Sequence, residues 1–378
     1  MIFSTLNYVK LKIYYQADSD LILTSYKGAT LSAIFKKALR DTCCDEKIAQ
    51  CKPNKHNKNN VIEIEDKFCP KVRTCTYAIT AEHISETDED TVLPYIISCP
   101  NENLNYIPKD STFNFELILI GNSTKTHEKI IKGLEAWENY DISDFKAFYS
   151  QKEIETLCFD NAYSPQKRPK GTVRLQKIDQ ILENGIRPIY LSNSIKQLPI
   201  VELLEMESEF KDESTIDMKV NFISPVELKK KQKNIAGNNV DFLIFYNALR
   251  RRINDLIYYF GTTIDKEVQD KEIRHCLDLA PTVQTSKNFL QKNEITTVSN
   301  MNRNFAPINK ETKIESQMFH QKRINKKINY YKIGLTGEIV FTDIPSCFIQ
   351  WIKAAEIFRI GKSPTQGFGE FSATFFKS

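Results

Sequence analysis

The chain has 378 residues, of which 41% are hydrophobic and 26% charged, enough to build the cores of two domains. No apolar run reaches the roughly eighteen residues that span a bilayer, and the N-terminus lacks the apolar segment of a signal peptide, so we expect a cytoplasmic protein. The net charge is only +4, and nine cysteines, an odd number, favour reduced thiols over a disulfide framework.

The first half of the chain predicts a helix followed by a buried strand. Residues 30–40 carry apolar side chains at helical spacing, with Thr30 as the expected N-cap. Residues 113–121 (FNFELILIG) alternate at period two and are apolar on both faces at their end, which indicates a central strand.

The second half repeats this order of elements. Residues 242–260 form an apolar helical stripe that ends at Gly261, and a hairpin is expected at 333–340 (IGLTGEIV). A helix with its core stripe around Trp351 follows, and then a strand at 370–376. We expect residues 285–327, which are polar and basic, to order only on binding RNA.

Each half thus offers strand, helix, hairpin, helix and strand, which builds an antiparallel sheet with helices on one face. We therefore predict an α+β protein with two ferredoxin-like (RRM-like) domains. An acidic stretch at residues 201–214 separates them, so the predicted domains are 1–213 and 214–378.

The charge is divided unequally between these halves. Residues 214–378 carry 25 Lys+Arg and 16 Asp+Glu, whereas residues 1–213 carry 27 and 32. The C-terminal half is therefore the expected nucleic-acid-binding half. Its basic clusters lie at residues 229–233, at Arg250, Arg251 and Arg252, and at 322–327.

A glycine-rich basic loop at residues 359–371 (RIGKSPTQGFGEF) precedes the last predicted strand. Its three glycines, Gly361, Gly367 and Gly369, allow a close approach to a phosphate backbone beside Lys362. A nucleotide-binding P-loop would need a glycine at the position of Glu356 and a helix after the lysine, and neither is present.

This order, helix then G-K-x4-G-x-G then terminal strand, resembles the glycine-rich loop of CRISPR-associated RAMP proteins, in particular the precursor-crRNA endoribonucleases of the Cas-six type. The resemblance covers nearly the whole chain. It includes the entry to the first helix at residues 26–29 (YKGA), a cysteine-bearing segment closing at Cys75, residues 171–174 (GTVR), and the helix that carries Arg250, Arg251 and Arg252.

The resemblance implies metal-independent cleavage of CRISPR repeat RNA by the ribose 2′-hydroxyl, leaving a 2′,3′-cyclic phosphate and a 5′-hydroxyl. It implies repeat RNA or crRNA and CRISPR effector subunits as partners, and no cofactor. The alternative is a RAMP subunit that binds crRNA within an effector complex without cutting. The sequence contains no paired acidic motif typical of a two-metal nuclease.

Members of this family commonly place a histidine near the first helix, but residues 24–40 contain none. Tyr26 and Lys27 occupy that position, and some members use tyrosine and lysine. Of the five histidines, His320 has the most basic surroundings, because Lys322 and Arg323 follow it and would attract a phosphate. The catalytic candidates are therefore His320, Tyr26 and Lys27.

The expected RNA contacts lie in the basic helix, beside His320 and in the loop: Arg250, Arg251, Arg252, Lys322, Arg323, Arg359, Gly361, Lys362, Gly367 and Gly369. Phe368 would either stack on a base or anchor the loop. Cys44, Cys51, Cys69 and Cys75 resemble a cysteine group that could hold zinc in this branch of the family, although their C-x6-C and C-x5-C spacings are not those of common zinc sites. Small buried thiols are the other interpretation.

Overall fold

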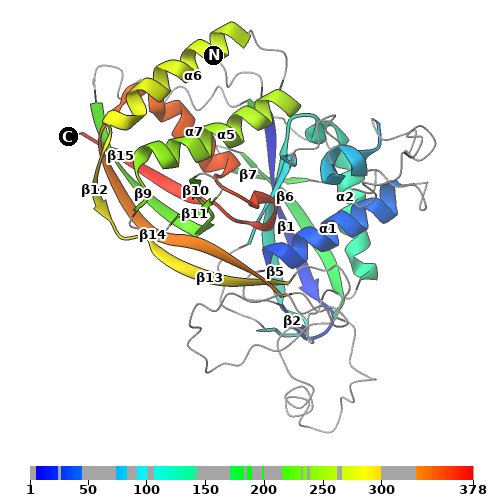
Figure 1. Cartoon of the computed structure of the whole chain (residues 1–378). Coiled ribbons are helices and arrows are strands. Elements are labelled where there is room, and N and C mark those ends of the chain that lie inside the picture. The colour runs from blue at the N-terminus through cyan, green and yellow to red at the C-terminus, as the bar shows by residue number, and fades with distance from the viewer. Residues whose placement is uncertain are drawn as a thin grey trace, which may run out of the picture.

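A computed structural model describes most of the chain, and Figure 1 shows its arrangement. The described residues are 6–23, 27–44, 74–82, 92–99, 106–140, 142, 171–182, 185–189, 198–199, 215–230, 233–235, 239–261, 266–298 and 329–377.

Most of the described strands up to residue 199 form one antiparallel sheet in the order β3-β5-β1-β6-β7, with β8 paired to the start of β1. Its strands are β1 (Asn7–Ala17), β3 (Tyr95–Ser98), β5 (Thr112–Ile120), β6 (Val173–Leu182), β7 (Gly185–Ile189) and β8 (Leu198–Pro199). The helical elements of this half are α1 (Gly28–Cys43), η3 (Ala78–Glu82), η4 (Gly121–Thr126), α2 (His127–Glu135) and η5 (Ala136–Asn139).

A second antiparallel sheet is built from strands after residue 214, in the order β12-β14-β9-β15, with β13 also paired to β14. Its strands are β9 (Thr215–Val226), β12 (Gln284–Asn288), β13 (Gln291–Val298), β14 (Asn329–Pro345) and β15 (Phe371–Phe376). The helical elements are α5 (Phe242–Phe260), α6 (Lys266–Leu279), η8 (Ala280–Thr282), η9 (Ser346–Phe348), α7 (Ile349–Phe358) and η10 (Pro364–Gln366). Two short ribbons complete the described strands: β2 (Leu21–Ile22) with β4 (Tyr106–Ile107), and β10 (Lys229–Lys230) with β11 (Lys233–Asn234).

Both sheets have the same topology. The strand order β3-β5-β1-β6 of the first sheet corresponds to the order β12-β14-β9-β15 of the second, in which β12 and β13 together occupy one position beside β14. Helices connect β1 to β3 and β5 to β6 in the first half, and β9 to β12 and β14 to β15 in the second. This is the ferredoxin-like arrangement, so the predicted α+β fold with two tandem ferredoxin-like halves is confirmed. The predicted boundary at residue 213 lies outside the described residues.

The first core lies between the first sheet and its helices. It takes the odd-numbered side chains of β1 and β5 and the apolar stripe of α1, including Leu31, Phe35 and Leu39. Trp137 is fully buried there and stacks on Tyr15 and Phe115, at centroid distances of 5.1 and 5.3 Å. This packing fixes α1 to the sheet.

The second core extends from the C-terminal half into the N-terminal half. It contains the inward faces of α5 and α7, which cover the second sheet in Figure 1, together with Leu6 and Tyr8 of the first half. The opposite face of the first sheet contributes Ile96, Ile118 and Ile120 to it. The second core is therefore shared by the two halves.

Several local predictions are corrected by the structure. The helix of the first half begins at Gly28 with Lys27 as its N-cap, so Thr30 lies inside it. Residues 333–340 belong to one long strand with a register shift at Gly337, rather than to a hairpin. Part of the 285–327 stretch is ordered without RNA, because β12 and β13 pair with β14.

Among the described residues, no helix is both long and apolar enough to cross a membrane.

The shared core predicts that Phe358→Ala destabilises the whole protein. Phe358 is fully buried at the end of α7, and its ring meets Tyr8 of β1 edge-on at 6.0 Å. Removing a buried phenyl ring should lower the free energy of unfolding by about 3–5 kcal/mol, measured by urea denaturation. Tyr258→Ala is the control, because Tyr258 is 73% exposed, and its effect should stay within about 0.5 kcal/mol. Two separate unfolding transitions in the parent protein would contradict a shared core.

Candidate active site

The glycine-rich loop between α7 and β15 is a tightly folded turn that contacts the chain's own backbone. Arg359, Gly361, Ser363, Gly367 and Gly369 all have positive φ angles, between 62° and 88°. A Cβ on Gly361 would lie 2.6 Å from the Glu227 carbonyl oxygen, and one on Gly369 would overlap the Ile360 carbonyl. These glycines are therefore required by close backbone packing and by left-handed conformation. Phe368 is fully buried, so it anchors the loop.

The N-terminus of α1 lies directly against this loop. A Cβ on Gly28 would overlap the backbone carbonyl of Gln366, so only glycine allows the two backbones to approach so closely. Lys27, the N-cap residue, is only 7% exposed, and its side chain makes no capping hydrogen bond. The junction therefore brings Lys27, from the first half, beside a loop of the second half.

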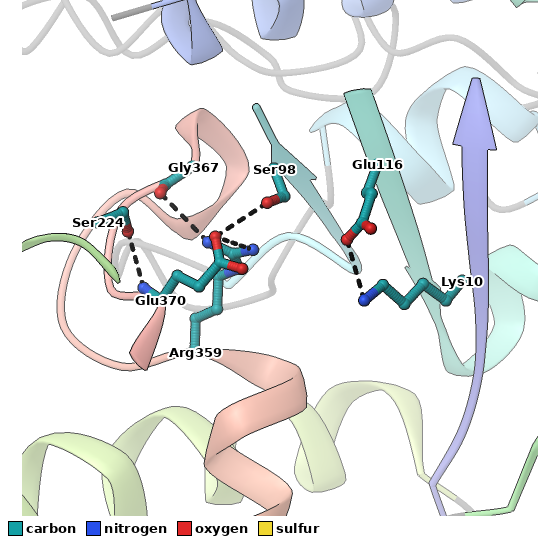
Figure 2. A network of polar contacts seen from close by, with 7 residues as sticks. All are labelled: Lys10, Ser98, Glu116, Ser224, Arg359, Gly367 and Glu370. Atoms are coloured by element: carbon teal, nitrogen blue, oxygen red, sulfur yellow. Dashed lines mark hydrogen bonds and ion pairs between the residues drawn. The ribbon is translucent and has the colours of Figure 1, made fainter. Parts of the chain in front are cut away.

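A network of polar contacts joins the loop to both sheets (Figure 2). The Arg359 guanidinium is 2% exposed and pairs with the Glu370 carboxylate at 2.7 Å, while its Nη1 donates to the Gly367 carbonyl at 3.3 Å. The hydroxyl of Ser98, at the end of β3, donates to the same carboxylate at 2.9 Å. The Glu370 amide donates to the Ser224 hydroxyl at 2.8 Å.

Cys99 lies in the same electrostatic neighbourhood. Burial raises the pKa of its thiol to about 12, and Glu370 adds to this rise, whereas Lys27 and Arg359 oppose it. The thiol is therefore neutral at physiological pH, and it is not a nucleophile in this state.

The basic residues predicted to bind RNA divide into exposed and buried groups. Lys362 and Arg251 are exposed. Arg250 is half-buried and donates to the Asn247 side chain at 3.2 Å. Arg252 is buried, its Nε donates to the Phe358 carbonyl at 3.4 Å, and burial lowers its pKa to about 9. Arg252 and Arg359 thus face the interior, beside the end of α7.

Other predicted site residues lie outside the described residues: Tyr26, His320, Lys322, Arg323, Cys51 and Cys69. Of the proposed zinc ligands, Cys44 is buried at the end of α1 and Cys75 is half-buried, with its Sγ 4.0 Å from the Cys43 carbonyl. Within the part of the chain that is described, no group of three His, Cys, Asp or Glu side chains is arranged to hold a metal ion.

Sequence reasoning missed three members of the junction: Ser98, Cys99 and Ser224. They come from the ends or edges of strands far from the loop in sequence, and tertiary folding alone brings them together. Glu370 could have been identified from the sequence. It is the single carboxylate of residues 359–371, which also contain the two basic residues Arg359 and Lys362.

Two family models match the chain in succession. One, described as an N-terminal domain, matches residues 6–198. The other, described as CRISPR-associated endoribonuclease Cas6, matches residues 220–371, which include the glycine-rich loop. No curated protein matches the chain significantly.

Solved structures of Cas6 proteins have a similar fold. A chain from a partial Cas6-RT-Cas1–Cas2 complex is similar over 100% of this chain and 47% of its own length, at 10% identity and a TM-score of 0.51. This protein thus spans about half the length of that chain. Thermus thermophilus Cas6 is similar over 98% of this chain and 99% of its own, at 9% identity and a TM-score of 0.47. The protein of a Cas6 product complex is similar over 97% of this chain and 100% of its own length, at 10% identity and a TM-score of 0.49.

The match over residues 220–371, together with the tandem ferredoxin-like fold, identifies a CRISPR-associated protein. The fold that it shares with a chain of a Cas6-RT-Cas1–Cas2 complex extends over the whole chain, so this is a Cas6-type protein.

The contact between Gly28 and Gln366 predicts that Gly28→Ala separates the two halves locally. The added methyl group overlaps a backbone carbonyl, which no side-chain rotation can relieve, so the variant should lose about 1–3 kcal/mol of unfolding free energy. Gly133→Ala in α2 is the control. Its Cβ would lie 3.4 Å from Leu39, an ordinary contact, and alanine has the higher helix propensity. Equal stability of the two variants in chemical denaturation would show that the loop does not press on α1.

Proposed function

We propose that this protein is a metal-independent endoribonuclease that binds CRISPR repeat RNA and cleaves precursor crRNA at the junction of α1 and the glycine-rich loop. The observation that carries the proposal is the backbone contact between Gly28 and Gln366, which places Lys27 beside the loop in a Cas6-type chain.

The proposed reaction uses a nucleophile that belongs to the RNA. The 2′-oxygen attacks the adjacent phosphorus and loses its proton, the bond from phosphorus to the 5′-oxygen breaks, and that oxygen takes up a proton. The products are a 2′,3′-cyclic phosphate and a 5′-hydroxyl. The protein must align these atoms, transfer two protons and stabilise the extra charge on the phosphorane.

Lys27 is suited to stabilising the extra negative charge on the phosphorane. Lys27 is the N-cap residue of α1, where the helix dipole also favours an anion, and Lys362 adds an exposed cation on the loop side. Tyr26 and His320 are the proposed groups for proton transfer, because a phenol or an imidazole can give and take protons whereas a charged ammonium accepts none.

The proposed partners are the repeat RNA, the processed crRNA and other CRISPR proteins. The match to the Cas6 family model supports the first two, and the similarity to a chain of a Cas6-RT-Cas1–Cas2 complex supports the third. Arg251 and Lys362 are the proposed RNA contacts among the described basic residues, since both are exposed in the basic half.

Cleavage itself is tested with the repeat RNA encoded beside the gene. We expect cutting at one site to persist in excess EDTA and to stop when the nucleotide before the cut carries 2′-deoxyribose, since the nucleophile is then missing. Product ends are mapped by mass spectrometry. Loss of cutting in EDTA with recovery on adding magnesium would contradict the mechanism, and a parent protein that binds its repeat without cutting would favour a crRNA-binding subunit.

The position of the catalytic groups is tested by single-turnover rates. Lys27→Ala and Tyr26→Phe should each lower the rate by about 10²-fold or more with nearly unchanged RNA affinity, because a lost charge or proton donor acts on the transition state. His320→Ala should do the same if the imidazole is the base, and the parent rate should then level off above about pH 7. A rate that rises up to about pH 9 would instead indicate a lysine as base. If all three variants cut like the parent, the site lies elsewhere.

The RNA-contact residues are tested by binding at several salt concentrations. Lys362→Ala and Arg251→Ala should weaken binding and reduce the dependence of log Kd on log salt, by about one counterion per lost phosphate contact. Arg174→Ala is the matched control, because Arg174 is an exposed arginine of the acidic half that already pairs with Asp18 at 3.1 Å. Unchanged affinity and salt dependence in both test variants would mean that the RNA follows another surface.

A further inference from the structure

Glu370 is the residue on which the loop, the second sheet and the first sheet converge. Its carboxylate accepts from Arg359 at 2.7 Å and from Ser98 at 2.9 Å, and its backbone amide and carbonyl bond to β9 through Ser224 and Ile223. Figure 2 shows Arg359 and Ser98 approaching the carboxylate from opposite elements, the loop and β3.

The charge of Glu370 is required by the burial of Arg359. A guanidinium that is 2% exposed cannot be solvated by water, so its charge must be balanced within the protein. Among the described contacts, Glu370 supplies the ion pair and Gly367 a carbonyl, and both lie in the loop or directly after it. The pair therefore closes the loop on itself at the point where it leaves α7.

The hydroxyl of Ser98 extends this closed loop to the other half. Ser98 ends β3, an edge strand of the first sheet, and η10 of the loop packs against both β3 and α1. The loop is thus held to the first half at two places, at Ser98 through Glu370 and at Gly28 through Gln366. We therefore expect a displacement of the Glu370 side chain to change the distance between the loop and Lys27.

We propose that Glu370 is a positioning residue, which acts through Arg359 and Ser98 to hold the glycine-rich loop against the N-terminus of α1 in the geometry that cleavage requires. The inference rests on the proposed function for its effect on cutting. Its structural part, the attachment of the loop, is independent of that function.

The experiment compares Glu370→Gln and Ser98→Ala with the parent protein by hydrogen exchange and by single-turnover cleavage of the repeat RNA. Glutamine keeps an oxygen that can accept from Ser98 but loses the charge that balances Arg359. The control is Glu116→Gln, because the Glu116 carboxylate is equally exposed and pairs with Lys10 at 2.9 Å, but within the first sheet.

Glu370→Gln should speed amide exchange in residues 360–369 and at the start of α1, and Ser98→Ala should do so to a lesser extent. The cleavage rate should fall by about tenfold or more in Glu370→Gln, with Kd for RNA changed by less than about threefold, because misplacement by even 1 Å is costly to a reaction but not to phosphate binding. Because both changes act on one attachment, the effects of Glu370→Gln and Ser98→Ala on the rate should not simply add in the double variant. Glu116→Gln should leave exchange and rate unchanged.

Exchange in residues 360–369 that matches the parent and the Glu116→Gln control would overturn the proposal, whether or not the protein cuts RNA. A parent that never cuts, combined with faster exchange in Glu370→Gln, would refute the proposed function and leave the attachment standing. Faster exchange together with an unchanged cleavage rate and cut site would show that Glu370 stabilises the loop without positioning it for the reaction, and this too would overturn the proposal.

Discussion

The ion pair between Arg359 and Glu370 closes the glycine-rich loop at which the two halves of this protein meet. Arg359 stands at the end of α7 with a φ of 62°, so the chain turns sharply there and carries a guanidinium into the interior. Left without an anion, that buried charge would cost several kcal/mol. Glu370, placed where β15 begins, supplies the anion and thereby fixes both ends of the glycine-rich loop at the same point. The loop has little freedom once this pair has formed.

Because the glycine-rich loop is fixed, it presents a defined surface against which the first half packs. The N-terminus of α1 meets it at Gly28, and Ser98 of β3 reaches Glu370 from the neighbouring edge. The apolar core continues beneath this polar layer, where Tyr8 contacts Phe358. Residues from both halves are therefore needed to build the junction, and neither ferredoxin-like unit contains the site by itself.

Such an arrangement can serve a reaction in which the RNA supplies its own nucleophile. The protein then needs little covalent chemistry, and its contribution lies in alignment and in charge placed before the reaction begins. Lys27 and Lys362 are cations presented from two domains, so their separation depends on the interface rather than on any single helix or strand. We therefore expect Glu370 and Ser98 to matter to activity without touching RNA.

Most of the fold could be predicted from local sequence patterns. Residues 242–260 were predicted as a helix and form α5, with Gly261 as its C-cap, because apolar periodicity and a helix-stopping glycine agree there. The tandem α+β plan was predicted from patterns of the same kind, whereas β12 and β13 were not predicted. Strand pairing was harder: residues 333–340 have a glycine where a hairpin could turn, but Gly337 marks a register shift in β14, which depends on its partners β9 and β13.

The site could be predicted only in part. The glycine-rich loop and the start of the first helix were both identified from their residues, yet nothing in the sequence indicated that Gly28 and Gln366 are in contact. Glycines predicted to approach RNA are needed for close contacts within the chain, as Gly369 is with Ile360, and two arginines predicted to face RNA are buried. Patterns of residue type indicate which positions carry unusual glycines or charges. The partner of a buried charge, however, depends on tertiary packing.

Site-specific crosslinking tests most directly whether the scissile phosphate binds where α1 meets the glycine-rich loop. A repeat RNA with a photoreactive nucleotide at the cleavage site, blocked by 2′-deoxyribose, is irradiated in complex with the full chain, and the attached peptides are identified by mass spectrometry. If the phosphate binds there, crosslinks should form in two peptides, one containing Lys27 and Gly28 and one containing residues 361–369. Crosslinks confined to other parts of the chain, with neither of these peptides labelled, would contradict this placement of the phosphate.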